Sequence, residues 1–157
     1  MKKYTILLVD DEESQREPIK GFLENEGYFV FPASSFDESI KIFKDNDIDL
    51  VITDYRLKAK TGLDILNAVK SINPLVPVIV MTAYGTIESA VNLMKSGAFD
   101  FIQKPIELDE LLLSIRKTEE LSSLKSENRQ LKQLLSEKYS LTDPESETQV
   151  EIINNNP

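Results

Sequence analysis

The sequence of 157 residues contains no cysteine and no histidine. Without cysteine, the chain forms no disulfide and offers no thiolate to a metal or a substrate. Without histidine, it has no Ser/His/Asp triad and no imidazole ligand for zinc, and it cannot form phosphohistidine on itself. Any chemistry that this chain performs therefore rests on carboxylates, hydroxyls and lysines.

Basic residues are in the minority, because 18 Lys and Arg stand against 27 Asp and Glu and the net charge is −9. Proteins that bind nucleic acid usually present a basic patch, so we expect no direct DNA binding by this chain. Long apolar runs are also missing. The run Ile6–Val9 ends at acidic residues and is too short for the core of a signal peptide, so we expect a cytoplasmic protein that does not enter a membrane.

Short segments rich in Val and Ile alternate five times with segments of helical spacing. Strict alternation of this kind favours right-handed βαβ units, in which a parallel sheet is covered by helices on both faces. The sequence therefore predicts an α/β fold with a doubly wound, five-stranded parallel sheet of (βα)5 type. The five expected strands are Ile6–Val9, Phe29–Phe31, Leu50–Thr53, Val78–Met81 and Phe99–Ile102.

The last expected helix continues beyond the sheet domain, with apolar residues at steps of three and four that are typical of a coiled coil. An Asn in such a seam sets the register of two-stranded pairing; a single amphipathic helix lying on its own domain is the alternative. We expect a sheet domain over 1–118, a helical linker over 119–138 and a flexible tail over 139–157. The seam consists of Leu121, Leu124, Asn128, Leu131 and Leu135.

Polar side chains stand at the carboxyl ends of four expected strands, which is the edge where open parallel sheets bind ligands. Carboxylates that converge there repel one another unless a hard cation such as Mg²⁺ lies between them. An Asp in this setting can attack phosphorus, while a hydroxyl and an ammonium bind the phosphoryl oxygens. Each residue alone has an ordinary explanation as a cap, a strand residue or a solvated charge. Together they predict a phosphoacceptor site: Asp10, Asp11, Asp54, Thr82 and Lys104.

Over about residues 4–118 the chain resembles the receiver domain of two-component response regulators, which have a CheY-like, flavodoxin-like fold. The matching segments are Ile-Leu-Leu-Val-Asp-Asp-Glu at 6–12, Leu-Val-Ile-Thr-Asp-Tyr-Arg-Leu at 50–57, Val-Ile-Val-Met-Thr-Ala at 78–83 and Lys-Pro at 104–105.

This resemblance implies a role for each matching residue. Asp54 would accept a phosphoryl group from a sensor histidine kinase, and Thr82 and Lys104 would bind that group. Asp10, Asp11 and Asp54 would hold Mg²⁺ together with the backbone carbonyl of Arg56, with Asp10 acting largely through water. The peptide bond before Pro105 would be cis, as is typical of the family.

A narrower resemblance, over 81–91 and 94–105, is to receivers of the NtrC type, which regulate sigma-54-dependent transcription activators. In that group the fifth helix often continues into a dimerising linker, which implies a homodimer formed through a receiver face and the C-terminal helix. Phe101 stands where the family's switch aromatic is often Tyr. A plain core aromatic is the alternative interpretation of Phe101.

We therefore expect a phosphorylation switch in which phosphate on Asp54 changes dimerisation and thereby transcription regulation. The alternative is a stand-alone receiver that acts in a phosphorelay or through protein–protein interaction. We do not expect an enzyme. A Mg²⁺-dependent phosphatase of α/β fold usually needs a second acid two residues after the nucleophile, and Arg56 occupies that position.

Overall fold

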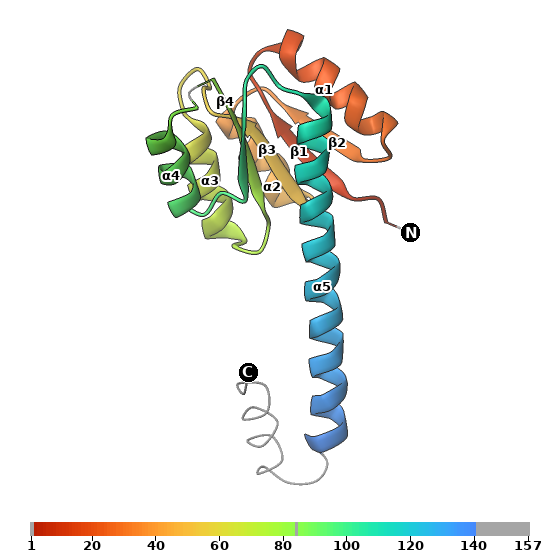
Figure 1. Cartoon of the computed structure of the whole chain (residues 1–157). Helices are drawn as coiled ribbons and strands as arrows, with labels where there is room; N and C mark the ends of the chain where they lie inside the picture. The colour runs from red at the N-terminus through yellow and green to blue at the C-terminus, as the bar shows by residue number, and fades with distance from the viewer. Residues whose placement is uncertain (1, 84, 141–157) are drawn as a thin grey trace. The chain divides into compact units, whose positions relative to one another are not determined.

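A computed structural model describes residues 2–83 and 85–140 of the chain, in which strands and helices alternate (Figure 1). The strands are β1 (Thr5–Val9), β2 (Phe29–Ala33), β3 (Leu50–Asp54), β4 (Val78–Thr82) and β5 (Asp100–Gln103). The helices are α1 (Glu13–Asn25), α2 (Phe36–Asp45), α3 (Gly62–Ile72), α4 (Ile87–Lys95) and α5 (Leu108–Ser140).

The five strands form one parallel sheet in the order β2-β1-β3-β4-β5, which confirms the predicted architecture. The strand bounds differ slightly from those expected. β3 includes Asp54, and β5 begins at Asp100, although the amide of Phe99 still donates to the carbonyl of Val78 at 2.8 Å. β1 lies between β2 and β3 in the sheet. The chain adds β2 on one side of β1 and then β3, β4 and β5 on the other, so the direction of winding reverses at the β1/β3 boundary.

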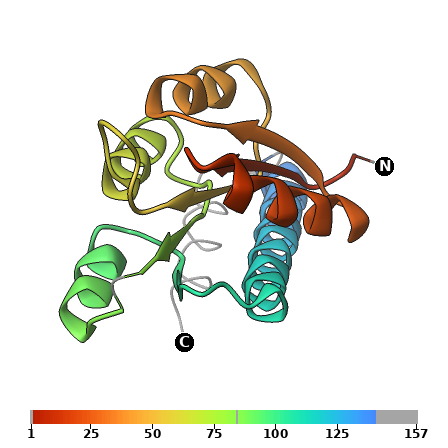
Figure 2. The ribbon, with the colours of Figure 1, turned by 90° about the horizontal axis from the view of Figure 1, so that it is seen from above.

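Both faces of the sheet are buried, because successive side chains of a strand point to opposite sides. Leu7 and Val9 of β1 belong to a core shared with α2, α3 and α4. Ile6 and Leu8 belong to a second core shared with α1 and α5. Figure 2, which looks from above, shows the helices distributed over the two faces in this way.

The start of α3 is specified by a reciprocal pair of hydrogen bonds. The Thr61 hydroxyl accepts from the amide of Asp64, and the Asp64 carboxylate accepts from the amide of Thr61 at 2.8 Å. This capping box satisfies amides that the first turn of a helix leaves unpaired. Because Thr61 follows the loop after β3, the cap also determines where that loop ends.

Two polar contacts attach the first turns of α5 to the sheet domain. The Ser114 hydroxyl donates to Asp100 Oδ2 at 2.8 Å, and the Tyr4 and Thr118 hydroxyls lie 2.7 Å apart. The chain divides after Thr118 into two compact units, 1–118 and 119–157. In the second unit α5 runs without interruption through the expected linker to Ser140, and its side chains from Glu120 to Lys138 are exposed.

α5 therefore includes Tyr139 and Ser140, the first two residues of the expected tail, and the remaining 141–157 lie outside the described residues. Within the described part of the chain, no helix combines the length and the hydropathy that crossing a bilayer requires.

The packing of α5 yields a first prediction. Leu111 is fully buried in the core shared with α1, whereas Leu113, two residues on, is 57% exposed. Leu111→Ala should lower the free energy of unfolding by about 2–5 kcal/mol, because it removes apolar contact and leaves a cavity. Leu113→Ala should change it by less than about 0.5 kcal/mol. Urea unfolding of both variants measures the difference, and equal losses would contradict the assigned face of α5.

Candidate functional site

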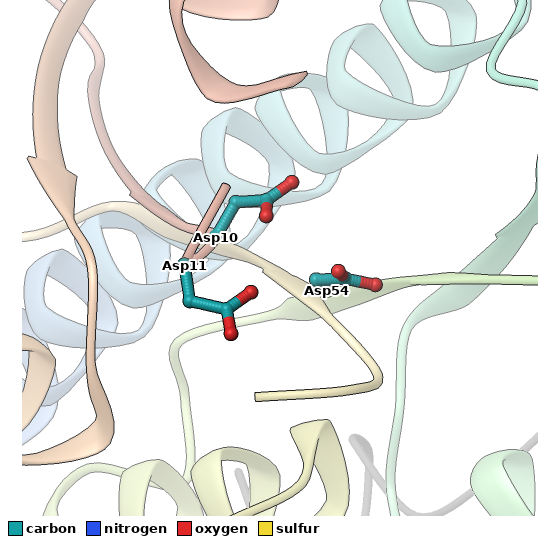
Figure 3. A group of neighbouring side chains, drawn as sticks. All are labelled: Asp10, Asp11 and Asp54. Carbon is teal, nitrogen blue, oxygen red and sulfur yellow. The ribbon is translucent and has the colours of Figure 1, made fainter. Parts of the chain in front are cut away.

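Three carboxylates converge at the carboxyl ends of β1 and β3, where the sheet topology reverses. Asp10 and Asp11 follow β1 directly, and Asp54 is the last residue of β3. Figure 3 shows the side chains of Asp10 and Asp11 extending toward Asp54. One carboxylate oxygen from each of the three lies within 4.8 Å of the others. The structure thus brings together acids that the sequence places at the ends of two different strands.

Asp10 is the most deeply buried of the three acids. Its side chain is fully buried, and Oδ1 accepts a hydrogen bond from the amide of Glu12 at 3.0 Å. Oδ2 is buried too, and it has no hydrogen-bond partner among the described residues. A buried carboxylate oxygen without a donor is costly, because it has lost water and gained nothing in return.

This environment changes the acidity of Asp10. Burial raises its pKa from 3.8 to about 6, and the negative charges of Asp54 and Asp11 add to the rise. The hydrogen bond from the Glu12 amide and the charge of Lys104 act in the opposite direction. Desolvation is the largest cause, so Asp10 is a group that a nearby cation would stabilise in its charged form.

Lys104 brings a positive charge to the same edge from the loop after β5. Its ammonium lies 2.9 Å from Asp54 Oδ1 and also donates to Gln15 Oε1 at 3.0 Å. The backbone amide of Lys104 donates to the carbonyl of Thr82 at 2.8 Å, and the Lys104–Pro105 peptide bond is cis. The residue is therefore held by its main chain as well as by its side chain.

The remaining residues singled out in the sequence lie at or near this edge. Thr82 ends β4 and is 3% exposed, and its neighbour across the sheet is Gln103 of β5. Phe101 lies opposite Val80 in the same pair of strands and is half-buried against the core shared with α2, α3 and α4. Arg56, two residues after Asp54, forms an isolated antiparallel bridge with Thr61.

The loop after β3 passes close to the backbone of Asp54. The amide of Gly62 donates to the carbonyl of Tyr55 at 2.6 Å. A Cβ atom at Gly62 would stand 2.9 Å from the carbonyl oxygen of Asp54 and 3.0 Å from the Cα of Tyr55. Only glycine allows this approach, and the loop thereby limits the space around Asp54.

The donor set suits Mg²⁺. Magnesium prefers oxygen ligands, keeps several waters and is often held by one or two carboxylates. The three acids supply such oxygens, and the unpartnered Oδ2 of Asp10 is the kind of atom that a cation or its water would satisfy. Burial is the main cause of the raised pKa of Asp10, and a divalent cation would also relieve the repulsion from Asp54 and Asp11 that adds to it. These residues could therefore hold Mg²⁺.

Sequence analysis missed two residues of this edge, both on α1. Gln15 binds the ammonium of Lys104, and Arg16 Nη1 donates to the backbone carbonyl of Asp10 at 2.8 Å. A polar residue near a helix start usually faces water, so the sequence carried no signal for either contact. The Gln15 contact depends on the packing of α1 beside the β5–α5 loop, and the Arg16 contact on how the helix folds back over Asp10.

A model of the response regulator receiver domain family matches residues 6–116. A putative NtrX-like response regulator of Rickettsia felis is 38% identical over 143 residues, which make up 90% of this chain and 30% of that protein. The regulatory protein AtoC of Escherichia coli is 37% identical over 131 residues, 83% of this chain and 28% of that protein. The chain thus spans about 30% of the length of these curated relatives.

Solved structures agree with the sequence comparison. A response regulator receiver domain from Clostridium thermocellum matches with a TM-score of 0.73 and 38% identity, over 76% of this chain and 97% of that chain. NtrX from Brucella abortus matches with a TM-score of 0.76 and 35% identity, over 83% of this chain and 30% of that chain.

The raised pKa of Asp10 makes a prediction for the metal-free protein. An acid with a higher pKa in the folded state costs stability as the pH rises from the unfolded to the folded pKa. The free energy of unfolding of Asp10→Asn should therefore equal that of the wild type below pH 3.8, the unfolded pKa. It should exceed the wild-type value by a growing amount up to the folded pKa of about 6, and the difference should stay constant at higher pH. The gain should reach at most about 3 kcal/mol. Urea unfolding in EDTA across this range measures it.

Asp45→Asn is the matched control, because Asp45 is an exposed acid at the end of α2. Its stability should follow that of the wild type at every pH. A gain for Asp10→Asn that did not change with pH would contradict the electrostatic origin of the effect.

Proposed function

The chain belongs to the response regulator receiver domain family as the receiver of an NtrC-like two-component response regulator, and we propose that Asp54 accepts a phosphoryl group from a sensor histidine kinase. The observation that carries this proposal is the Lys104 ammonium, 2.9 Å from Asp54 Oδ1 and beside the carboxylates of Asp10 and Asp11. A nucleophilic carboxylate next to a cation and a set of metal ligands suits phosphoryl transfer.

In the proposed reaction a carboxylate oxygen of Asp54 attacks the phosphorus of a phosphohistidine. The new P–O bond forms as the P–N bond breaks, and the electron pair of that bond leaves on the imidazole nitrogen. Because these 157 residues contain no histidine, the donor residue lies outside them. A histidine kinase is the partner that membership of this family implies.

Three groups would stabilise the transferred phosphoryl group. The Lys104 ammonium would oppose its negative charge, and the Thr82 hydroxyl would donate to one of its oxygens. Mg²⁺ would be held by Asp10, Asp11, Asp54 and the backbone carbonyl of Arg56, and it would supply further positive charge to the phosphoryl oxygens.

The proposed output is a change in dimerisation and thereby in sigma-54-dependent transcription. Phosphate on Asp54 would draw Thr82 inward and change the packing of Phe101, which lies on the neighbouring strand. The surface of α4 beside that strand is apolar: Ile87 is 84% exposed, and Val91 and Met94 are each more than 40% exposed. Exposed apolar patches of this kind mark interaction sites.

The leucines of α5 support a homodimer that also uses the C-terminal helix. Leu121, Leu124 and Leu131 are exposed at coiled-coil spacing. The relatives of which this chain spans about 30% include the regulatory protein AtoC and NtrX-like response regulators. We propose that the receiver acts as a switch within such an assembly and not as an enzyme that turns over a substrate.

Phosphorylation of the purified chain by acetyl phosphate with Mg²⁺ tests the site. The wild type should gain the mass of one phosphoryl group, and Asp54→Asn should gain none, because the amide is not a nucleophile. Intact-protein mass spectrometry measures both. Asp45→Asn serves as the control and should be phosphorylated like the wild type. Release of phosphate from an aryl phosphate well beyond one equivalent per chain would contradict the switch and favour a phosphatase.

Sedimentation with Mg²⁺, with and without beryllofluoride, tests the output. Beryllofluoride mimics the acyl phosphate, so the monomer–dimer dissociation constant of the wild type should change about tenfold or more, and that of Asp54→Asn should not change. Leu124→Glu with Leu131→Glu should weaken association in both states if α5 carries part of the interface. Beryllofluoride binding without any change in association would instead favour a stand-alone receiver that acts on another partner.

A further inference from the structure

Lys104 is held by a residue that no motif of the receiver family singles out in this sequence. Its ammonium lies between two acceptors, Asp54 Oδ1 at 2.9 Å and Gln15 Oε1 at 3.0 Å. Gln15 lies in the first turns of α1, 89 residues away in the sequence, and is half-buried. The side chain of Lys104 is 23% exposed, so the contact is largely shielded from water.

A lysine side chain needs such support to act at a defined point. Its four-carbon stem is flexible, and holding it in one arrangement costs conformational entropy. The ammonium has three donors, which allows it to keep one acceptor while it exchanges another. Gln15 can therefore stay bound as the ammonium moves from Asp54 Oδ1 to an oxygen of an incoming phosphoryl group.

The neutrality of Gln15 matters as much as its reach. Three carboxylates already share this edge, and a fourth beside Lys104 would form an ion pair with it. An anionic partner would compete with the phosphoryl oxygens for the ammonium. An amide oxygen orients the ammonium and leaves its charge available.

We propose that Gln15 is a positioning residue that holds Lys104 for phosphoryl transfer to Asp54. This inference rests on the function proposed above. The side chain of Gln15 is hydrogen-bonded to the Lys104 ammonium, so its role at Asp54 is exerted through Lys104.

The test compares phosphorylation rates of three proteins with acetyl phosphate at saturating Mg²⁺, followed by intact mass. Gln15→Leu should be slower than the wild type by about 3-fold to 10-fold, because one hydrogen bond to a charged group is lost. Gln15→Glu, which keeps the size of the side chain, should be slower still, by about 10-fold or more, because its carboxylate binds the ammonium. Ser14→Ala, an exposed neighbour on α1, is the control and should keep the wild-type rate.

Two further readouts separate positioning from a structural role. Thermal unfolding should show that Gln15→Glu stays folded, and its affinity for Mg²⁺ should equal or exceed that of the wild type, because its added charge is negative. A variant with intact metal binding and slow phosphorylation is the signature of a misplaced Lys104. A general structural defect would lower the affinity for Mg²⁺ and the phosphorylation rate together.

The outcomes distinguish this inference from the proposed function. If the wild type takes up no phosphoryl group, the proposed function fails. If the wild type is phosphorylated and both Gln15 variants react within about twofold of its rate, the positioning role is wrong and the contact is incidental. A Gln15→Glu variant that reacts faster than Gln15→Leu would also overturn it, because charge competition requires the reverse order.

Discussion

Repulsion among three carboxylates at one edge of the sheet is the interaction on which the arrangement of the other groups there depends. Asp10, Asp11 and Asp54 offer oxygens within 4.8 Å of one another, and Asp10 is fully buried. Like charges at this distance destabilise the fold unless positive charge compensates them. Lys104 provides part of that compensation at 2.9 Å from Asp54. Asp10 Oδ2 is buried without a donor among the described residues, so it is an atom that a cation or its water would satisfy.

The parallel sheet makes this arrangement possible because the interiors of its central strands are mostly apolar. Both faces of β1 and β3 are buried by helices, so a polar side chain can meet water or ligand only at a strand end. The order β2-β1-β3-β4-β5 then sets the ends of β1 and β3 side by side, with β4 and β5 next to them. Strand order, and not sequence proximity, therefore decides that residues 10, 54, 82 and 104 share one edge.

The fold and the positions of the acids could be predicted because both depend on local pattern. Alternating apolar segments determine strands and helices, and residues at strand ends of a parallel sheet must share an edge. The contact of Gln15 with Lys104 could not be predicted, because it depends on how α1 packs beside a loop 89 residues away. The close approach of Gly62 to Asp54 is equally hidden, since a glycine in a loop has many ordinary reasons to be there. The residues at the strand ends can therefore be predicted from the sequence, whereas contacts between elements distant in the sequence cannot.

Lys104 connects the site to the rest of the sheet domain through its main chain. Its amide donates to the carbonyl of Thr82, which ties the residue after β5 to the end of β4. At the other end of β5, the Asp100 carboxylate accepts from the amide of Phe101 and from the hydroxyl of Ser114 on α5. Hydrogen bonds therefore attach β5 at one end to the end of β4 and at the other end to α5. Because α5 runs as one helix to Ser140, the helix that Ser114 attaches to β5 is also the one that carries the exposed leucines.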